Sequence, residues 1–125
     1  MAPLVEPAME RWFTPEFHHH QPADVNRIRS IFASTDPLGY AASCRAIADA
    51  DLSERLVAVT APTLVLVGSE DHSTTPEMAL QIHEHIPGSS YEVVNGVAHL
   101  SNVAAPERFN QAIIRTDGIA RNDTL

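Results

Sequence analysis

The amino-acid sequence predicts an α/β protein, in which a helical segment precedes the last strand–helix–strand–helix run of a parallel sheet. Two observations lead to this prediction. The first part of the chain has helical apolar spacing and no β-favouring apolar run, whereas the second part alternates such runs with amphipathic stretches. The change falls near Ala61-Pro62. We therefore divide the 125 residues into a helical segment, 1–57, and a sheet segment, 58–125.

Three helical stretches are predicted in residues 1–57. The first begins at Pro22 and ends before Asp36-Pro37, with its apolar residues at 3.6-residue spacing. The second spans about residues 38–50 and is expected to bury a broad apolar face that includes Cys44 and Ile47. A short turn follows over residues 52–56.

A strand–helix–strand unit is predicted in residues 63–95. Thr63–Val67 is an unbroken β-favouring apolar run, typical of a strand covered on both faces of a parallel sheet. The next helix starts at Thr74 or Thr75 and ends at Pro87-Gly88. Its apolar stripe consists of Met78, Ala79, Ile82 and Ile86. Tyr91–Asn95 is the second strand, which a right-handed crossover makes parallel to the first.

The chain is predicted to end in a further helix and a loose tail. The helix begins near Pro106-Glu107, with Phe109, Ala112 and Ile113 facing inward, and the polar residues 115–125 form the tail. Two parallel strands are an incomplete sheet, because the apolar strand Thr63–Val67 would keep one edge and much of both faces open to water. We therefore expect an incomplete α/β fold that has no closed core of its own.

Composition and charge exclude several function classes. Eight basic residues, all of them Arg, against sixteen acidic ones give a net charge of −8, so no nucleic-acid partner is expected. The absence of Lys excludes Schiff-base chemistry. A single cysteine, Cys44, excludes a disulfide framework, and no apolar run approaches the roughly 20 residues of a membrane span. We expect no membrane partner and a cytoplasmic location.

Two polar side chains follow the predicted strands at the same edge of the sheet. Asp71 lies in the loop after the first strand and His99 in the loop after the second. A carboxylate there can accept the Nδ1 proton of the imidazole and fix its tautomer. Acid before histidine is also the chain order of the triad in serine hydrolases on this sheet type. The alternative is that Asp71 only caps the next helix and that His99 is a solvated turn residue.

The residues around both side chains resemble the C-terminal part of the α/β-hydrolase superfamily, and within it the 3-oxoadipate enol-lactonases. In the sheet segment, the likeness is carried by APTLVLVGSED (61–71), TP (75–76), IPG (86–88), GVAHLSN (96–102) and PERFN (106–110). In the helical segment, it is carried by ERWFTP (10–15), TDPLGYA (35–41) and IADADL (47–52), which are similar to the end of that family's lid. The likeness extends from about residue 10 to residue 114.

The resemblance implies a function and a role for three residues. It makes Asp71 the acid and His99 the general base of a Ser-His-Asp triad, and it makes residues 1–57 a helical lid or cap. Trp12 would line the lid wall over the substrate; the alternative is that it only packs the lid onto the core. The implied reaction is hydrolysis of the ester bond of an enol-lactone in aromatic-compound degradation (the β-ketoadipate pathway), without a cofactor. No metal site is expected, and His18, His19 and His20 are assigned to a solvated lid loop.

The nucleophile of such a triad is absent from this sequence, which contains no Gly-x-Ser-x-Gly turn. The amides of the oxyanion hole would be absent with it. We therefore expect no meaningful catalysis by the chain alone. The expected partners are a small lactone or ester substrate together with a missing N-terminal hydrolase half, or a second copy of this chain.

Two competing interpretations stay open. The chain could be a truncated, non-catalytic module that uses its open strand edge to form a dimer or to extend a partner's sheet. Alternatively, it could come from a different α/β hydrolase, such as an esterase, a cofactor-free haloperoxidase or a dehalogenase. The residues of the absent nucleophile turn would decide among these enzymes.

Overall fold

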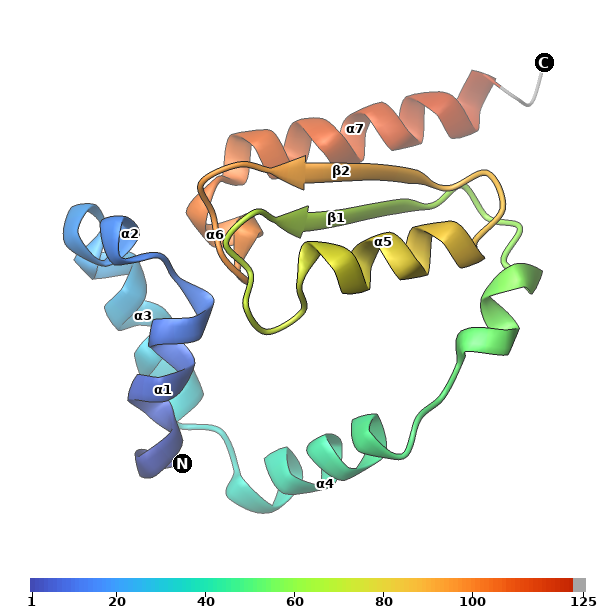
Figure 1. Cartoon of the computed structure of the whole chain (residues 1–125). Helices are drawn as coiled ribbons and strands as arrows, with labels where there is room; N and C mark the ends of the chain where they lie inside the picture. The colour runs from blue at the N-terminus through green and yellow to red at the C-terminus, as the bar shows by residue number, and fades with distance from the viewer. Residues whose placement is uncertain (123–125) are drawn as a thin grey trace.

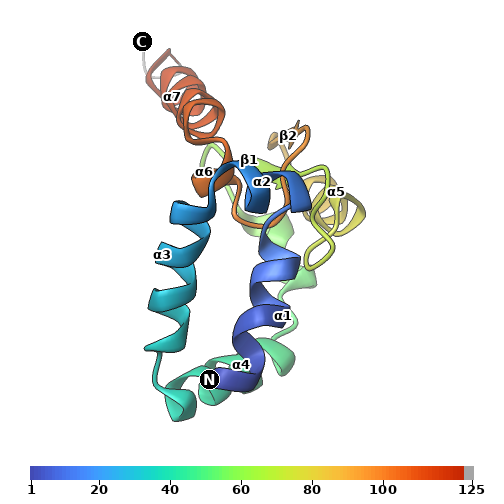
Figure 2. The same ribbon diagram turned by 90° about the vertical axis from the view of Figure 1, so that its left-hand side faces the viewer.

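Figure 1 shows a computed structural model of the chain, which describes residues 1–122. A group of N-terminal helices lies at one end of a two-stranded parallel sheet, and single helices lie along the two faces of the sheet. In Figure 2 the N-terminal helices α1 and α3 run side by side beneath the end of the sheet. The residues that sequence patterns placed at that end of the strands therefore face the helical segment.

The N-terminal helices form a small buried cluster of their own. Helix α1 spans Ala2–Trp12, α2 spans Pro15–His20 and α3 spans Pro22–Ala33. The cluster consists of Val5, Ala8, Met9, Phe13, Val25 and Phe32. The last of these helices was predicted at its observed position. The first two were not, and the expected loop at His18, His19 and His20 is wrong because these residues belong to α2.

Helix α4 (Pro37–Ala48) corrects the prediction of a buried apolar face. Asp36 caps it by accepting a hydrogen bond from the Gly39 N–H at 2.7 Å, but no residue of the helix is buried. Cys44 is exposed and Ile47 is 75% exposed. In Figure 1 this helix lies away from the sheet, and the following 3₁₀ helix η1 (Ser53–Ala58) brings the chain back to helix α5 (Pro76–His85), which it contacts. No other element of the described chain therefore covers the apolar face of α4.

The sheet consists of β1 (Leu64–Gly68) and β2 (Ser90–Val94), which pair in parallel from Leu64 opposite Ser90 to Gly68 opposite Val94. Helix α5 (Pro76–His85) connects them, and the Thr75 side chain accepts a hydrogen bond from the Met78 N–H at its start. Helix α5 and the last helix lie on opposite faces of the sheet in Figure 1. The predicted crossover unit is thus confirmed.

Half of the predicted apolar stripe of α5 lacks a partner. Ala79 and Ile86 are buried, whereas Met78 is 52% exposed and Ile82 is 44% exposed. Met78 and Ile82 line a cavity beside β1. Each of the two strands pairs on one side only within residues 1–122. The exposure of these apolar side chains therefore agrees with the expectation of an incomplete sheet.

The open edge of β1 presents the main-chain groups of alternate residues. The Ser90 N–H donates to the Thr63 carbonyl and the Ser69 N–H donates to the Val94 carbonyl, so odd-numbered residues of this segment bond to β2. Leu64 and Leu66 therefore direct their main-chain N–H and C=O groups toward the open edge. A further strand could pair there without disturbing β2.

The C-terminal segment is more helical than predicted. A short helix, α6 (Ser101–Ala104), precedes α7 (Pro106–Asn122). The expected loose tail from Arg115 is wrong up to Asn122, because these residues continue α7 and Arg115 forms an ion pair with Glu92 of β2 at 2.6 Å. Residues 123–125 of the predicted tail lie outside the described residues. No helix of the described part of the chain has the length and apolar character needed to cross a membrane.

Candidate active site

The loops after β1 and β2 are joined by direct hydrogen bonds. The Glu70 N–H donates to the Val97 carbonyl at 2.9 Å, and the Gly96 N–H donates to Ser69 Oγ at the same distance. A Cβ atom on Gly68 would lie 2.3 Å from the Val97 carbonyl oxygen and 2.4 Å from that of Ala98. Only glycine therefore permits the close approach that brings the two loops together.

Asp71 is buried at the end of the first loop, with 4% of its surface exposed. Its Oδ1 accepts hydrogen bonds from the Ser73 N–H at 2.8 Å and the Thr74 N–H at 3.0 Å. Its Oδ2 accepts one from Thr74 Oγ1 at 2.9 Å. The cap of α5 is Thr75. The alternative that Asp71 is merely the cap of the next helix is therefore wrong.

These hydrogen bonds keep Asp71 ionised despite its burial. Burial alone would raise the pKa of the carboxyl group. Donation by the Thr74 N–H, the His99 ring and the Ser73 N–H outweighs burial and holds the pKa of Asp71 below its ordinary value. The carboxylate therefore carries a negative charge at neutral pH.

His99 lies against this carboxylate, with its Nδ1 atom 2.9 Å from Asp71 Oδ2. An ionised carboxylate can only accept, so Nδ1 is the donor and carries the proton. In the neutral ring, Nε2 then has a free lone pair with which it can take a proton. The predicted juxtaposition of the two side chains is confirmed, and its geometry suits a general base with an orienting acid.

Trp12 lies beside the same histidine. The centroids of the Trp12 and His99 rings are 6.3 Å apart with an angle of 28° between their planes, and the Leu100 N–H donates to the Trp12 carbonyl at 3.2 Å. The indole also makes an edge contact with Phe32 of α3, with the ring centroids 4.9 Å apart. Trp12 therefore borders the Asp71–His99 pair and packs the helical segment onto it, whereas its role in a substrate wall stays a prediction.

Thr74 is a member of the site that the sequence patterns missed. Its Oγ1 lies 2.9 Å from Asp71 Oδ2 and 3.3 Å from His99 Nδ1. In the sequence, Thr74 was one of two candidates for the helix cap, and a threonine three residues after an acid is a common turn pattern. Only the fold shows that its hydroxyl reaches a histidine 25 residues further along the chain.

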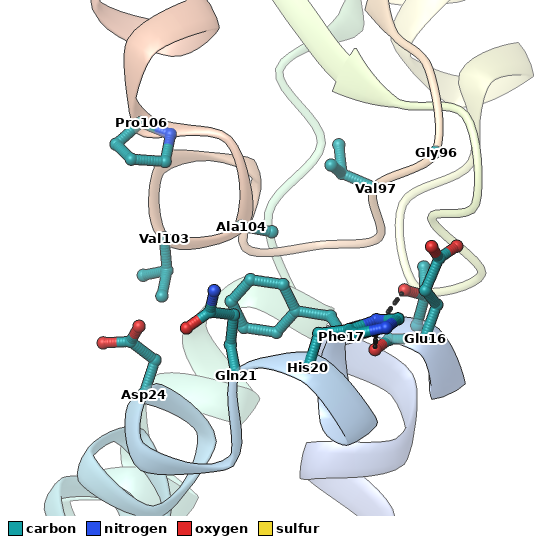
Figure 3. Close-up of a pocket in the computed structure, with 11 residues that line it drawn as sticks. Glu16, Phe17, His20, Gln21, Asp24, Gly96, Val97, Val103, Ala104 and Pro106 are labelled. Carbon is teal, nitrogen blue, oxygen red and sulfur yellow. Dashed lines mark hydrogen bonds between the residues drawn. The ribbon is translucent and has the colours of Figure 1, made fainter.

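A cavity of about 330 Å³ extends from β1 and α5 to the Asp71–His99 pair. Its lining combines the apolar Val65, Met78 and Ile82 with the polar Thr74 and Ser101. A larger cavity of about 430 Å³, drawn in Figure 3, lies between α2, the start of α3 and α6. Neither Asp71 nor His99 lines that second cavity, so we place the candidate active site at the first one.

The described residues contain no group of three or more His, Cys, Asp or Glu side chains placed to hold a metal ion. The histidines of α2 make other contacts. His18 Nε2 lies 3.1 Å from the Met9 carbonyl oxygen, and His20 Nδ1 lies 3.0 Å from that of Glu16. These contacts to main-chain carbonyls serve the packing of the helix.

Known proteins resemble this chain in both sequence and fold. 3-Oxoadipate enol-lactonase 2 of Acinetobacter baylyi is 36% identical over 113 residues, which are 90% of this chain and 42% of the relative. The enol-lactonase from Burkholderia xenovorans LB400 superposes with a TM-score of 0.90 at 30% identity, over 93% of this chain and 44% of that one. A thermophilic esterase from Thermogutta terrifontis superposes with a TM-score of 0.83 at 32% identity, over 90% of this chain and 42% of that one. No protein-family model matches the sequence.

The chain has a partial α/β-hydrolase fold, as predicted, and its neighbours among solved structures are α/β hydrolases. Its homologues at 36% identity are 3-oxoadipate enol-lactonases, and the match is consistent with a C-terminal portion of such an enzyme. The chain spans about two fifths of the length of these relatives, at 42% and 41%.

Proposed function

We propose that this chain supplies the acid, Asp71, and the general base, His99, of a Ser-His-Asp hydrolase that opens an enol-lactone ring. The observation that carries the proposal is the 2.9 Å hydrogen bond between Asp71 Oδ2 and His99 Nδ1 after two adjacent parallel strands. It is supported by the likeness to relatives that are named 3-oxoadipate enol-lactonases. The proposal places the enzyme in the cytoplasm, in aromatic-compound degradation.

The reaction follows from the orientation of His99. Nε2 takes the proton of the attacking serine hydroxyl, whose oxygen forms a bond to the lactone carbonyl carbon. The negative charge moves to the carbonyl oxygen, where main-chain amides stabilise it. When the ring C–O bond breaks, the leaving oxygen receives the proton from Nε2 and departs as an enol, which becomes the ketone. His99 then activates water to release the acid from the serine.

The serine and the amides would come from a further polypeptide segment that pairs with the open edge of β1. Leu64 and Leu66 offer main-chain groups there, and the apolar cavity beside β1 leads directly to His99. The relatives are more than twice as long as the part that this chain matches. We therefore assign the edge to the segment that carries a Gly-x-Ser-x-Gly turn, rather than to a second copy of this chain.

Trp12 is assigned to the wall of the substrate site. Its ring lies beside that of His99, which puts the indole next to the proposed general base. An aromatic face there would exclude water from the charged intermediate and strengthen its stabilisation.

A complementation experiment tests the proposal. The chain is combined with the N-terminal part of the Acinetobacter relative, and hydrolysis of an enol-lactone and of a nitrophenyl ester is measured. We expect the chain alone to hydrolyse neither substrate above the buffer rate and the complex to turn over the lactone. His99→Ala should remove that activity. Turnover by the chain alone that His99→Ala abolishes, or a folded complex without activity, would contradict the proposal.

The same experiment distinguishes two other candidates. The likeness to a thermophilic esterase favours a simple ester as substrate, in which case the complex would prefer the nitrophenyl ester. The open strand edge also suits a non-catalytic module that dimerises. A stable homodimer that rejects the added segment, measured by light scattering, would support that interpretation.

A further inference from the structure

Thr74 contacts both members of the Asp71–His99 pair. Its N–H donates to Asp71 Oδ1 at 3.0 Å and its Oγ1 donates to Asp71 Oδ2 at 2.9 Å. The same Oγ1 lies 3.3 Å from His99 Nδ1, which itself lies 2.9 Å from Asp71 Oδ2. The hydroxyl, the carboxylate oxygen and the ring nitrogen thus form a closed triangle of polar contacts.

The number of protons on these three groups determines which atom donates in each hydrogen bond. A threonine hydroxyl carries one proton and an ionised carboxylate only accepts, so the hydroxyl proton points toward Asp71 Oδ2. The lone pairs of Thr74 Oγ1 then face His99 Nδ1. A ring with no proton on Nδ1 would direct a lone pair at two acceptors, which is unfavourable. The triangle is complete only when Nδ1 carries the proton.

We propose that Thr74 is a positioning residue for His99, whose hydroxyl holds Asp71 Oδ2 in place and favours the tautomer with the proton on Nδ1. This tautomer leaves Nε2 free to act as a base. The consequence for catalysis rests on the proposed function, whereas the effect on the tautomer is a property of the chain alone. Trp12 limits the ring from one side, and Thr74 acts on its Nδ1 edge.

Nitrogen NMR of the His99 ring tests the proposal on the chain as it is. Thr74→Val replaces the hydroxyl with a methyl group of similar shape, Thr74→Ser keeps the hydroxyl, and Ser73→Ala is the matched control. Ser73 contributes to the Asp71 carboxylate through its main-chain N–H, which alanine retains. We expect the wild type, Thr74→Ser and Ser73→Ala to show one tautomer with a protonated Nδ1.

In Thr74→Val the ring signals should move toward a tautomer mixture, and exchange of the Nδ1 proton with water should become about tenfold faster, the effect of losing one hydrogen bond. Backbone amide spectra check the fold, and Thr74→Ala serves if the valine variant does not fold. Unchanged ring signals in the variants without the hydroxyl, or the same change in Ser73→Ala, would overturn the proposal.

Activity of the complemented hydrolase gives an independent readout. Thr74→Val should lower kcat about tenfold with KM unchanged, and Thr74→Ser should restore it, because the residue acts through His99 and not on bound substrate. An inactive wild-type complex would refute the proposed function but leave the NMR result intact. An active complex that Thr74→Val does not impair would refute the positioning role alone.

Discussion

At the scale of single residues, the carboxylate of Asp71 has four hydrogen-bond donors around its two oxygens. Three of them come from Ser73 and Thr74, and the fourth comes from His99. Such a buried carboxylate is stable only while it is ionised and fully bonded. Its charge therefore links the stability of the fold to pH.

Asp71 should make the chain less stable in acid. Because its pKa is lower in the folded chain than in the unfolded one, the stabilisation is complete above the unfolded value of about 3.9 and is lost as the pH falls through the folded value. Asp71→Asn should reduce the free energy of unfolding at pH 7 by about 1–3 kcal/mol, since an amide nitrogen cannot accept these bonds. The difference should shrink toward pH 2 in urea titrations; a constant difference would contradict this role of the charge.

Trp12, the only tryptophan of the sequence, should report its contact with His99. His99→Ala should shift the emission of Trp12, because it removes the imidazole from beside the indole and opens that side of the ring to water. His83→Ala is the control, because His83 stacks on Tyr91 and not on Trp12. Unchanged emission in His99→Ala would mean that the indole and the imidazole are not in contact in solution.

At the scale of elements, local sequence patterns predicted the helix start and the strand that neighbouring residues determine. Thr75 with Pro76 started α5 as expected, and the apolar run from Thr63 became β1 shifted by one residue. The first helix was missed because Pro7 interrupts its pattern, although Val5 and Met9 are buried at the spacing of a helix. The expected burial of α4 was wrong, since a pattern shows which face is apolar and not whether another element covers it.

Only part of the candidate site could be predicted from the sequence. Asp71 and His99 follow the ends of parallel strands, so topology alone placed them together. The role of Thr74 depends on the direction of one hydroxyl group, and no periodic pattern in the sequence indicates that direction. The close approach at Gly68 likewise depends on carbonyl groups almost thirty residues away, which only the folded loops bring near.

Gly68→Ala should disrupt the contact between the two loops. The new methyl group would lie less than 2.5 Å from the carbonyl oxygens of Val97 and Ala98, which are main-chain atoms that cannot turn away. We expect a loss of about 2–4 kcal/mol in the free energy of unfolding and loss of the His99 Nδ1 signal. Gly39→Ala is the control: its methyl group would meet only side-chain atoms of Asp36, the nearest at 3.2 Å, and no comparable loss of stability is expected. Equal effects of both changes would contradict this account.

At the scale of the whole molecule, each strand of the sheet pairs on one side only within residues 1–122, so both outer edges are open. The exposed side chains of Met78 and Ile82 on α5 line the cavity beside β1, and Ile47 on α4 is exposed as well. A surface of this kind is typical of one that another polypeptide covers.

Two proline variants separate the two edges of β1. Leu66→Pro removes an N–H from the open edge, so the chain alone should fold while complementation by the N-terminal segment is lost. Val65→Pro removes an N–H that bonds to β2 and should unfold the sheet, at a cost of about 3 kcal/mol or more. Circular dichroism and the lactone assay provide the measurements. Full activity of the Leu66→Pro complex would show that the added segment does not pair with this edge.

The contacts of Asp71 and His99 also bear on how the proposed hydrolase could arise. Acid, base, the supporting hydroxyl and the glycine at the end of β1 all lie within residues 64–99, a single strand–helix–strand unit. An acid–base pair of this kind can therefore be copied, recombined or inherited as one cassette. In the proposed enzyme, a partner would then contribute the alcohol and the amides of the esterolytic centre.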